Sequence, residues 1–204
     1  AFLNFLVEIA RACAREDLFA PGPVILSAGG SRYFDQVSRI FGAAELGRPT
    51  EVVLRSGCYF SLDARGYAEA AARLPERTPE VSGLGPGLRP ALEVWAVVQS
   101  TPEPGLAVAT MGKRDVSHDL GPPVPRQWYR AGLHQRPQDL GSGFQVSGLY
   151  DQHSCLSVPA DSPLEIGDLV GFGIAHPCTT FDKWRLLYVV DDDYTVTEAI
   201  RTFF

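Results

Sequence analysis

The sequence predicts an α/β portion followed by a β portion, and three observations lead to this fold class. Up to about residue 75, amphipathic helix patterns alternate with continuous apolar runs, which is typical of an α/β fold with a parallel sheet. Residues 75–90 are rich in proline and glycine, as in a linker. Beyond them the apolar runs read as strands. We therefore expect two domains, over residues 1–85 and 86–204.

The first portion is expected to hold three helices and two strands. In the opening helix, apolar residues recur at intervals of three and four, so one stripe is buried. Both strand candidates are continuous apolar runs, as expected of parallel strands covered on both faces. The predicted elements are helix 2–16, strand 24–27, helix 33–46, strand 51–55 and helix 67–74. Because so small a sheet leaves its edges unpaired, we expect the rest of this domain to lie upstream of Ala1.

The second portion is expected to be an antiparallel β domain. A stretch with four prolines, residues 120–143, is predicted to be a long loop. The predicted strands are 91–100, 105–112, 144–152, 168–176 and 184–192.

Composition and charge exclude several classes of protein. The net charge is −6 and no basic patch stands out, which argues against a nucleic-acid partner. No apolar run approaches the ~18 residues of a membrane span. The four cysteines are widely spaced and form no CxxC pair, which argues against a disulfide scaffold. We expect a protein of the reducing cytoplasm.

Two strand ends carry candidate phosphate ligands. The turn AGGS, residues 28–31, lies between a strand and a helix, where backbone N–H groups and the helix dipole favour an anion. The segment RSGCY, residues 55–59, follows the next strand. Carboxyl ends of parallel strands gather ligands at one edge, so both segments could share one phosphate. Alternatively, Ser31 is a helix cap after a tight turn and Arg55 is a paired structural arginine.

The segment HPCTTFDKW, residues 176–184, carries a candidate metal pair. His176 and Cys178 are two positions apart, so in an extended segment their side chains face the same side. An imidazole and a thiolate suit Zn²⁺. Two protein ligands would leave open positions, as in a catalytic site. The alternative is a buried cysteine and a hydrogen-bonded histidine in a β core.

Two further segments add polar groups. In DQH, residues 151–153, Gln152 and His153 could reach the metal, orient its ligands or bind substrate, or they could belong to a surface turn. In MGKRDVSHD, residues 111–119, a basic side chain could bind a substrate carboxylate, or the segment could be a solvated loop.

Several segments together resemble a known family. They are LSAGGSRYFD, VVLRSGCYFSLD, PEPGLAVATMGKRDVSHD, LYDQHSCL, VGFGIAHPCTTFDKW, and VVDDDYTV followed by IRTFF. They resemble the carboxyl-terminal half of the D-serine dehydratase/D-threonine aldolase-like family, in its bacterial amino acid deaminase or D-serine deaminase form. The resemblance implies a pyridoxal 5'-phosphate (PLP) enzyme with an alanine-racemase-like fold. Residues 1–85 would be the last part of a TIM-type (β/α) barrel, and residues 86–204 a β domain carrying the metal site.

The resemblance also implies roles for single residues. In the family's metal pair, aldolases tend to have Asp where dehydratases have Cys, so Cys178 favours a zinc-assisted dehydratase. Arg55 resembles the arginine that faces the pyridine nitrogen. His153 is a candidate metal ligand, orienting group or proton donor. The implied phosphate ligands are Gly29, Gly30 and Ser31 in one turn and Ser56, Gly57, Cys58 and Tyr59 in the other, and the implied metal ligands are His176 and Cys178.

The implied activity belongs to a longer parent protein. It would be a PLP- and zinc-dependent lyase that eliminates water and ammonia from a D-3-hydroxy amino acid such as D-serine. The alternatives are a D-threonine-type aldolase and a non-catalytic metal-binding β module. The family's Schiff-base lysine lies on the first barrel strand, and neither Lys113 nor Lys183 matches it. We therefore expect this chain to be inactive alone, and family habit suggests a homodimer.

Overall fold

The computed structural model describes residues 1–57, 59–83, 85 and 87–203. The chain forms two compact units. The amino-terminal unit comprises Ala1–Phe60 and Glu69–Leu88, and the carboxyl-terminal unit comprises Ser61–Ala68 and Arg89–Phe204. The domain boundary expected between residues 85 and 86 stays a prediction. No helix in the described part of the chain is long and apolar enough to cross a bilayer.

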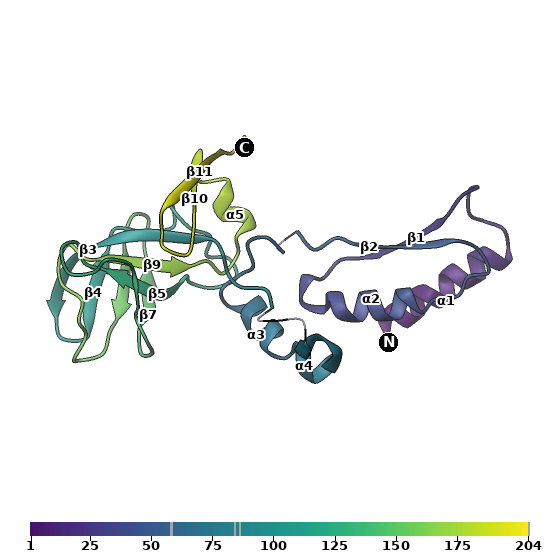
Figure 1. The fold of residues 1–204 in the computed structure, drawn as a ribbon, viewed down its shortest axis with the longest axis horizontal. Helices are drawn as coiled ribbons and strands as arrows, with labels where there is room; N and C mark the ends of the chain where they lie inside the picture. Colours follow the sequence, from purple (N-terminus) through teal and green to yellow (C-terminus); the bar gives the residue numbers. More distant parts are fainter. Residues whose placement is uncertain (58, 84, 86, 204) are drawn as a thin grey trace. The chain divides into compact units, whose positions relative to one another are not determined.

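The amino-terminal unit is built on one pair of parallel strands, which run in register from Val24↔Thr50 to Ala28↔Leu54. Helices α1 and α2 lie on one side of this pair (Figure 1). The elements up to residue 83 are α1 (Phe2–Arg15), β1 (Val24–Ala28), the 3-10 turn η1 (Ser31–Tyr33), α2 (Phe34–Gly42), β2 (Thr50–Leu54), α3 (Gly66–Ala72), α4 (Leu74–Arg77) and the 3-10 turn η2 (Pro79–Gly83).

One face of this strand pair is buried and the other is open. The helices cover Val24 and Leu26, whereas Ile25 on the opposite face is 62% exposed and Val53 is 40% exposed. The expectation that both faces are covered is therefore wrong for this chain, because both helices pack on the same face. The described residues form no recognisable (β/α) barrel, although the order of helices and strands is the predicted α/β order.

The segment expected to be a linker is attached to α2 through a buried carboxylate. Arg77 Nη2 lies 3.3 Å from Asp35 Oδ1, and Thr78 Oγ1 donates to Asp35 Oδ2 at 3.0 Å. Burial raises the pKa of Asp35, but hydrogen bonds from Gln36 and Thr78 and the charge of Arg77 outweigh it and lower the pKa below its usual 3.8. The start of the predicted linker is therefore an anchored segment.

The carboxyl-terminal unit is an antiparallel sheet that curls, as predicted for a β domain (Figure 1). Its seven strands lie in the order β6-β5-β9-β3-β4-β8-β7, and β10 and β11 form a separate hairpin. The elements are β3 (Glu93–Glu103), β4 (Leu106–Ala109), β5 (Val124–Tyr129), β6 (Gln138–Asp139), β7 (Gln145–Leu149), β8 (Ser154–Ser157), β9 (Leu169–Gly173), α5 (Cys178–Phe181), β10 (Leu186–Val190) and β11 (Val196–Arg201).

The region predicted to be a long loop contains two of these strands. Strand β5 pairs with β9 over its length, but the register shifts between Pro125 and Gln127. Proline has no N–H for the ladder and is tolerated in a sheet at such irregularities. The prediction of one long loop over residues 120–143 is therefore wrong, because a bulge accommodates the proline that argued against a strand.

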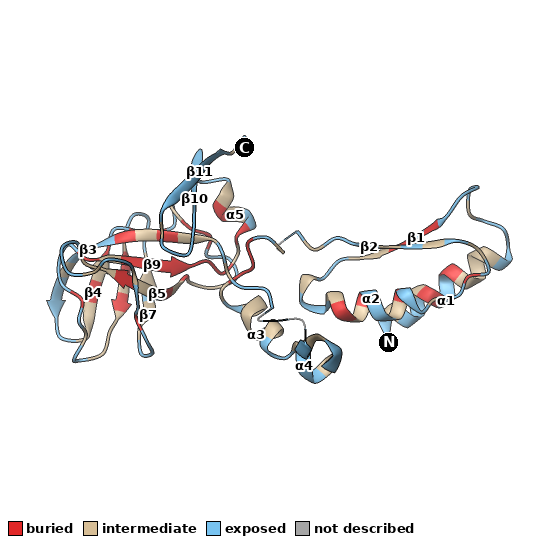
Figure 2. Cartoon of the chain, viewed as in Figure 1, coloured by how far each residue is buried: buried red, intermediate tan, exposed pale blue. Residues whose placement is uncertain are grey.

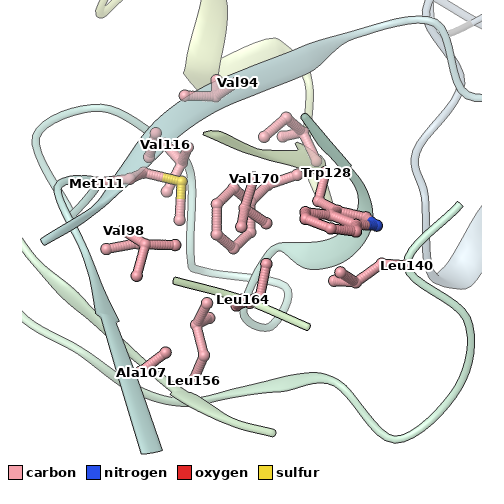
Figure 3. Packing of buried hydrophobic residues seen from close by; sticks show 14 residues of the cluster. Val94, Val98, Ala107, Met111, Val116, Trp128, Leu140, Leu156, Leu164 and Val170 are labelled. Carbon is pink, nitrogen blue, oxygen red and sulfur yellow. The ribbon is translucent and has the colours of Figure 1, made fainter. Parts of the chain in front are cut away.

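The core of this unit lies inside the curl of the sheet (Figures 2 and 3). Val170 and Phe172 of β9 are completely buried in it. On the opposite face of β9, a Cβ on Gly171 would lie 2.6 Å from the Trp95 ring, so only glycine fits there. Strand β9 is thereby fixed on both faces, and the candidate metal segment follows directly after it.

Candidate functional site

The turns after β1 and β2 lie at one edge of the parallel pair, because Ala28 and Leu54 are register partners. Gly30 has a φ of 104°, in the left-handed region that favours glycine. Its carbonyl accepts a hydrogen bond from the Tyr33 N–H at 2.9 Å. Ser31 begins a short 3-10 turn, so the predicted helix starts only at Phe34.

Arg55 links the two strand ends. Its Nε donates to Ser27 Oγ at 2.9 Å, and that hydroxyl donates to the Val53 carbonyl at 2.8 Å. A Cβ on Gly29 would lie 3.6 Å from Arg55 Nη2, so the guanidinium runs alongside the glycine turn. Within the described residues Arg55 forms no ion pair. Among the described residues the guanidinium hydrogen-bonds only to a hydroxyl, so no acid neutralises its charge there and it can pair with an anion at this edge.

Tyr59 supplies an unpaired polar atom in the same unit. Its ring packs edge-on against Phe34 at the start of α2, with centroids 5.4 Å apart. Its Oη is buried and, in the part of the chain that the structure describes, has no hydrogen-bond partner. Leaving a buried hydroxyl unpaired costs roughly 1–3 kcal/mol. A hydrogen-bond acceptor that reached this hydroxyl would remove that cost, and a phosphate oxygen is such an acceptor.

The remaining predicted phosphate ligands are the three residues Ser56, Gly57 and Cys58. Ser56 is half-buried, and Gly57 is exposed, where an added Cβ would meet no atom within 4 Å. Cys58 lies outside the described residues.

The metal segment has a different backbone from the one expected. Strand β9 ends at Gly173, and Pro177 takes helical angles, φ −53° and ψ −37°, so that Cys178 begins α5. The two candidate ligands therefore do not lie on one extended strand, so strand alternation does not place their side chains on the same side. His176 is half-buried and Cys178 is exposed. That the two bind one metal ion stays a prediction.

His176 has a carboxylate partner that the sequence did not suggest. Its Nδ1 lies 2.6 Å from Asp119 Oδ2, and Thr179 Oγ1 lies 3.5 Å from the other oxygen of that carboxylate. The hydrogen bond with His176 lowers the pKa of Asp119 below its usual 3.8, against a smaller opposing effect of burial. Asp119 is the last residue of MGKRDVSHD, a segment singled out for its basic residues rather than for this acid.

Residues 111–119, which we name the central loop, contact the metal segment at two further points. The Ser117 N–H donates to Thr180 Oγ1 at 2.9 Å, and that hydroxyl lies 3.0 Å from Ser117 Oγ. Trp184 Nε1 donates to the Asp115 carbonyl at 2.7 Å. The central loop therefore holds the metal segment along its whole length.

The opposite end of the central loop contacts the DQH turn. The Lys113 N–H donates to the Tyr150 carbonyl at 2.7 Å, and a Cβ on Gly112 would lie 2.4 Å from the Asp151 backbone. His153 is half-buried, and its carbonyl accepts from the Tyr150 N–H at 2.8 Å. One loop thus connects both candidate segments.

Within the described residues the structure does not assemble a complete set of metal ligands. Over residues 1–57, 59–83, 85 and 87–203, no three His, Cys, Asp or Glu side chains form a group that could hold a metal ion. The donor chemistry still fits zinc, because the second nitrogen of His176 and the Cys178 thiol are a borderline and a soft ligand. A site with two such ligands keeps positions open for solvent or substrate.

Comparison with known proteins identifies relatives of this chain. Residues 91–190 match a family model described as "Putative serine dehydratase domain", and this range includes the candidate metal pair. The chain is related to the PLP-dependent D-amino acid dehydratases and aldolases. The predicted resemblance is thereby confirmed. None of the curated proteins matches.

Several solved structures share the fold of this chain. D-threonine aldolase from Filomicrobium marinum is 25% identical, with a TM-score of 0.62 over 92% of this chain and 43% of that one. D-threo-3-hydroxyaspartate dehydratase from Delftia sp. HT23 is 22% identical, with a TM-score of 0.56 over 98% and 51%. An alanine-racemase-like protein from Idiomarina loihiensis is 14% identical, with a TM-score of 0.59 over 95% and 47%. The chain thus spans about half the length of these proteins.

Proposed function

We propose that this chain is part of a PLP- and zinc-dependent lyase that eliminates water and ammonia from a D-3-hydroxy amino acid such as D-serine. The match of residues 91–190 to a serine dehydratase domain carries this proposal, because His176 and Cys178 lie within the match. A bound PLP supplies an electron sink at Cα, and a bound zinc ion supplies a Lewis acid for the β-hydroxyl, a poor leaving group. The four separated cysteines support a cytoplasmic location.

At the phosphate edge, the chain contributes donors. The N–H groups of Gly29 and Gly30, with the Ser31 hydroxyl, would face the phosphate oxygens. Tyr59 Oη would donate the hydrogen bond that it lacks, as described above. The Arg55 side chain, fixed by Ser27, would add positive charge at the same edge. Ser56, Gly57 and Cys58 complete the proposed set.

At the metal segment, the chain contributes ligands and a proton donor. The His176 imidazole and the Cys178 thiolate would hold the zinc ion. His153 would donate a proton to the departing hydroxyl. It belongs to the DQH turn, which packs closely against Gly112 of the central loop.

The second candidate function is a D-threonine-type aldolase. It is favoured by the structure from Filomicrobium marinum, which is 25% identical to this chain. Cys178 favours dehydration, since the resemblance gives dehydratases a cysteine at this position. One solved dehydratase structure is described as a variant with a cysteine replaced by alanine, in the metal-free form.

The test is product analysis with the complete protein that carries this chain. With D-serine, PLP and zinc we expect pyruvate and ammonia, and a chelator should abolish both. Glycine and an aldehyde from D-threonine, without pyruvate from D-serine, would indicate the aldolase instead. Zinc binding without the absorbance of bound PLP would indicate a non-catalytic metal-binding module.

A further inference from the structure

Asp119 Oδ2 and His176 Nδ1 lie too close together for both atoms to bind the same metal ion. Two ligand atoms on a tetrahedral zinc ion, each about 2.0–2.1 Å from it, lie about 3.3 Å apart. Asp119 Oδ2 and His176 Nδ1 are 2.6 Å apart. The contact is therefore a hydrogen bond, and Nδ1 is not a metal-binding nitrogen while it persists.

This hydrogen bond determines which ring nitrogen of His176 is free to bind a metal ion. A carboxylate accepts and does not donate when ionised, so the proton of a neutral imidazole resides on Nδ1. The lone pair then lies on Nε2. Histidines that bind metals commonly donate their other N–H to a carboxylate, which fixes the tautomer and the ring orientation.

We propose that Asp119 is a positioning residue that holds His176 in the tautomer with Nε2 as its metal-binding nitrogen. The inference rests on the zinc site proposed above. Asp119 itself does not contact the metal. Its side chain is 52% exposed, so the residue is not needed to fill a core.

A purely structural role for Asp119 can be separated from this one. The metal segment is also held to the central loop by the hydrogen bonds of Thr180 with Ser117 and of Trp184 with Asp115. Removing the Asp119 carboxylate leaves these contacts in place. The segment should remain attached, and the loss should appear in the orientation of one imidazole and in metal affinity.

The experiment compares Asp119→Ala and Asp119→Asn with the unchanged protein. Zinc dissociation constants are measured by competition with a chromophoric chelator, and thermal unfolding reports folding. Loss of a carboxylate that orients a ligand weakens metal binding about 10–100-fold, which we expect for Asp119→Ala. Asp119→Asn keeps one oxygen acceptor but loses the charge and exchanges the other oxygen for an amide donor, so we expect a smaller loss of several-fold. Asp182→Asn removes an exposed carboxylate from the same segment and should leave the constant unchanged.

Nitrogen-15 NMR of the metal-free protein, at a pH where the imidazole is neutral, gives a readout besides affinity. We expect the Nδ1-protonated tautomer of His176 in the unchanged protein and a shift toward the Nε2-protonated form in Asp119→Ala. Unchanged tautomer and affinity in both Asp119 variants would overturn the inference and leave the zinc site standing. If Asp119→Ala fails to fold, equal affinity of Asp119→Asn and Asp182→Asn would overturn it. Absence of zinc binding in the unchanged protein would instead refute the proposed site.

Discussion

Replacing Gly112 by alanine should separate the DQH turn from the central loop. Gly112 is buried, and its Cβ would lie 2.4 Å from the backbone carbon and oxygen of Asp151 and from the backbone nitrogen of Gln152. Real Cβ contacts do not occur at this distance, and backbone atoms cannot rotate away as a side-chain end can. The turn must therefore move by about 1 Å to restore van der Waals contact.

The structure gives the size of the expected effect. Overpacking by one methyl group costs about 1–3 kcal/mol, and for a chain of this length each kcal/mol lowers Tm by about 2–4 °C. We expect Gly112→Ala to lower Tm by about 2–12 °C. Gly83→Ala is the matched control, because its Cβ would meet no atom within 4 Å.

Thermal unfolding followed by circular dichroism measures the stability, and amide hydrogen exchange measures the local effect. The amides of Lys113 and Arg114 donate to Tyr150 and Asp151 at 2.7 and 3.1 Å, so both should lose protection in Gly112→Ala. A Tm equal to that of Gly83→Ala, with both amides still protected, would refute the packing of the turn against this loop.

Three further predictions concern other parts of the molecule. Tyr59→Phe should leave the stability of the cofactor-free protein unchanged or slightly higher, because the removed hydroxyl is buried and has no hydrogen-bond partner among the described residues. The same variant should weaken PLP binding measured by absorbance titration, and unchanged PLP affinity would exclude Tyr59 as a phosphate ligand. Arg130→Met should destabilise the carboxyl-terminal unit by about 3 kcal/mol in urea unfolding, because Arg130 bonds the carboxylate of Asp168 at 2.7 and 2.9 Å and the Asp168 side chain is 2% exposed. Burial raises the pKa of Asp168, but hydrogen bonds from Arg130 and the Glu165 N–H outweigh it and hold the pKa below 3.8. The stability that this ion pair contributes is therefore present above about pH 4 and is lost as the pH falls through the lowered pKa. The Arg130→Met protein should lose less stability on acidification than the unchanged protein, and parallel plots of unfolding free energy against pH for the two proteins would contradict this. Cys178→Asp should retain metal affinity but shift its preference from Zn²⁺ toward Mn²⁺, because a carboxylate is a harder ligand than a thiolate, and an unchanged ratio of the two dissociation constants would count against Cys178 as a ligand.

Local signals predicted much of the amino-terminal unit. The two apolar runs predicted to be parallel strands form β1 and β2, and a glycine-containing turn follows each strand as expected. Periodicity could not predict that one face is open at Ile25, because a strand pattern reports the hydrophobicity of a face and not what covers it.

The features that could not be predicted from the sequence depend on contacts between distant segments. Asp119 and His176 are 57 positions apart, and no local pattern pairs two loops over such a separation. Strand β5 was missed because the bulge that accommodates Pro125 depends on its partner β9. The helical start at Cys178 was missed because Pro177 suits a helix start as well as a loop.

The zinc site at the end of β9 is tested most directly by X-ray absorption at the zinc edge. The protein loaded with one equivalent of zinc should show a single sulfur neighbour at about 2.3 Å and nitrogen or oxygen neighbours at about 2.0–2.1 Å. The sulfur contribution should vanish in Cys178→Ala and persist in Cys155→Ala. A first shell without sulfur in the unchanged protein, or one that keeps its sulfur in Cys178→Ala, would contradict the assignment of Cys178 and His176 as the zinc ligands.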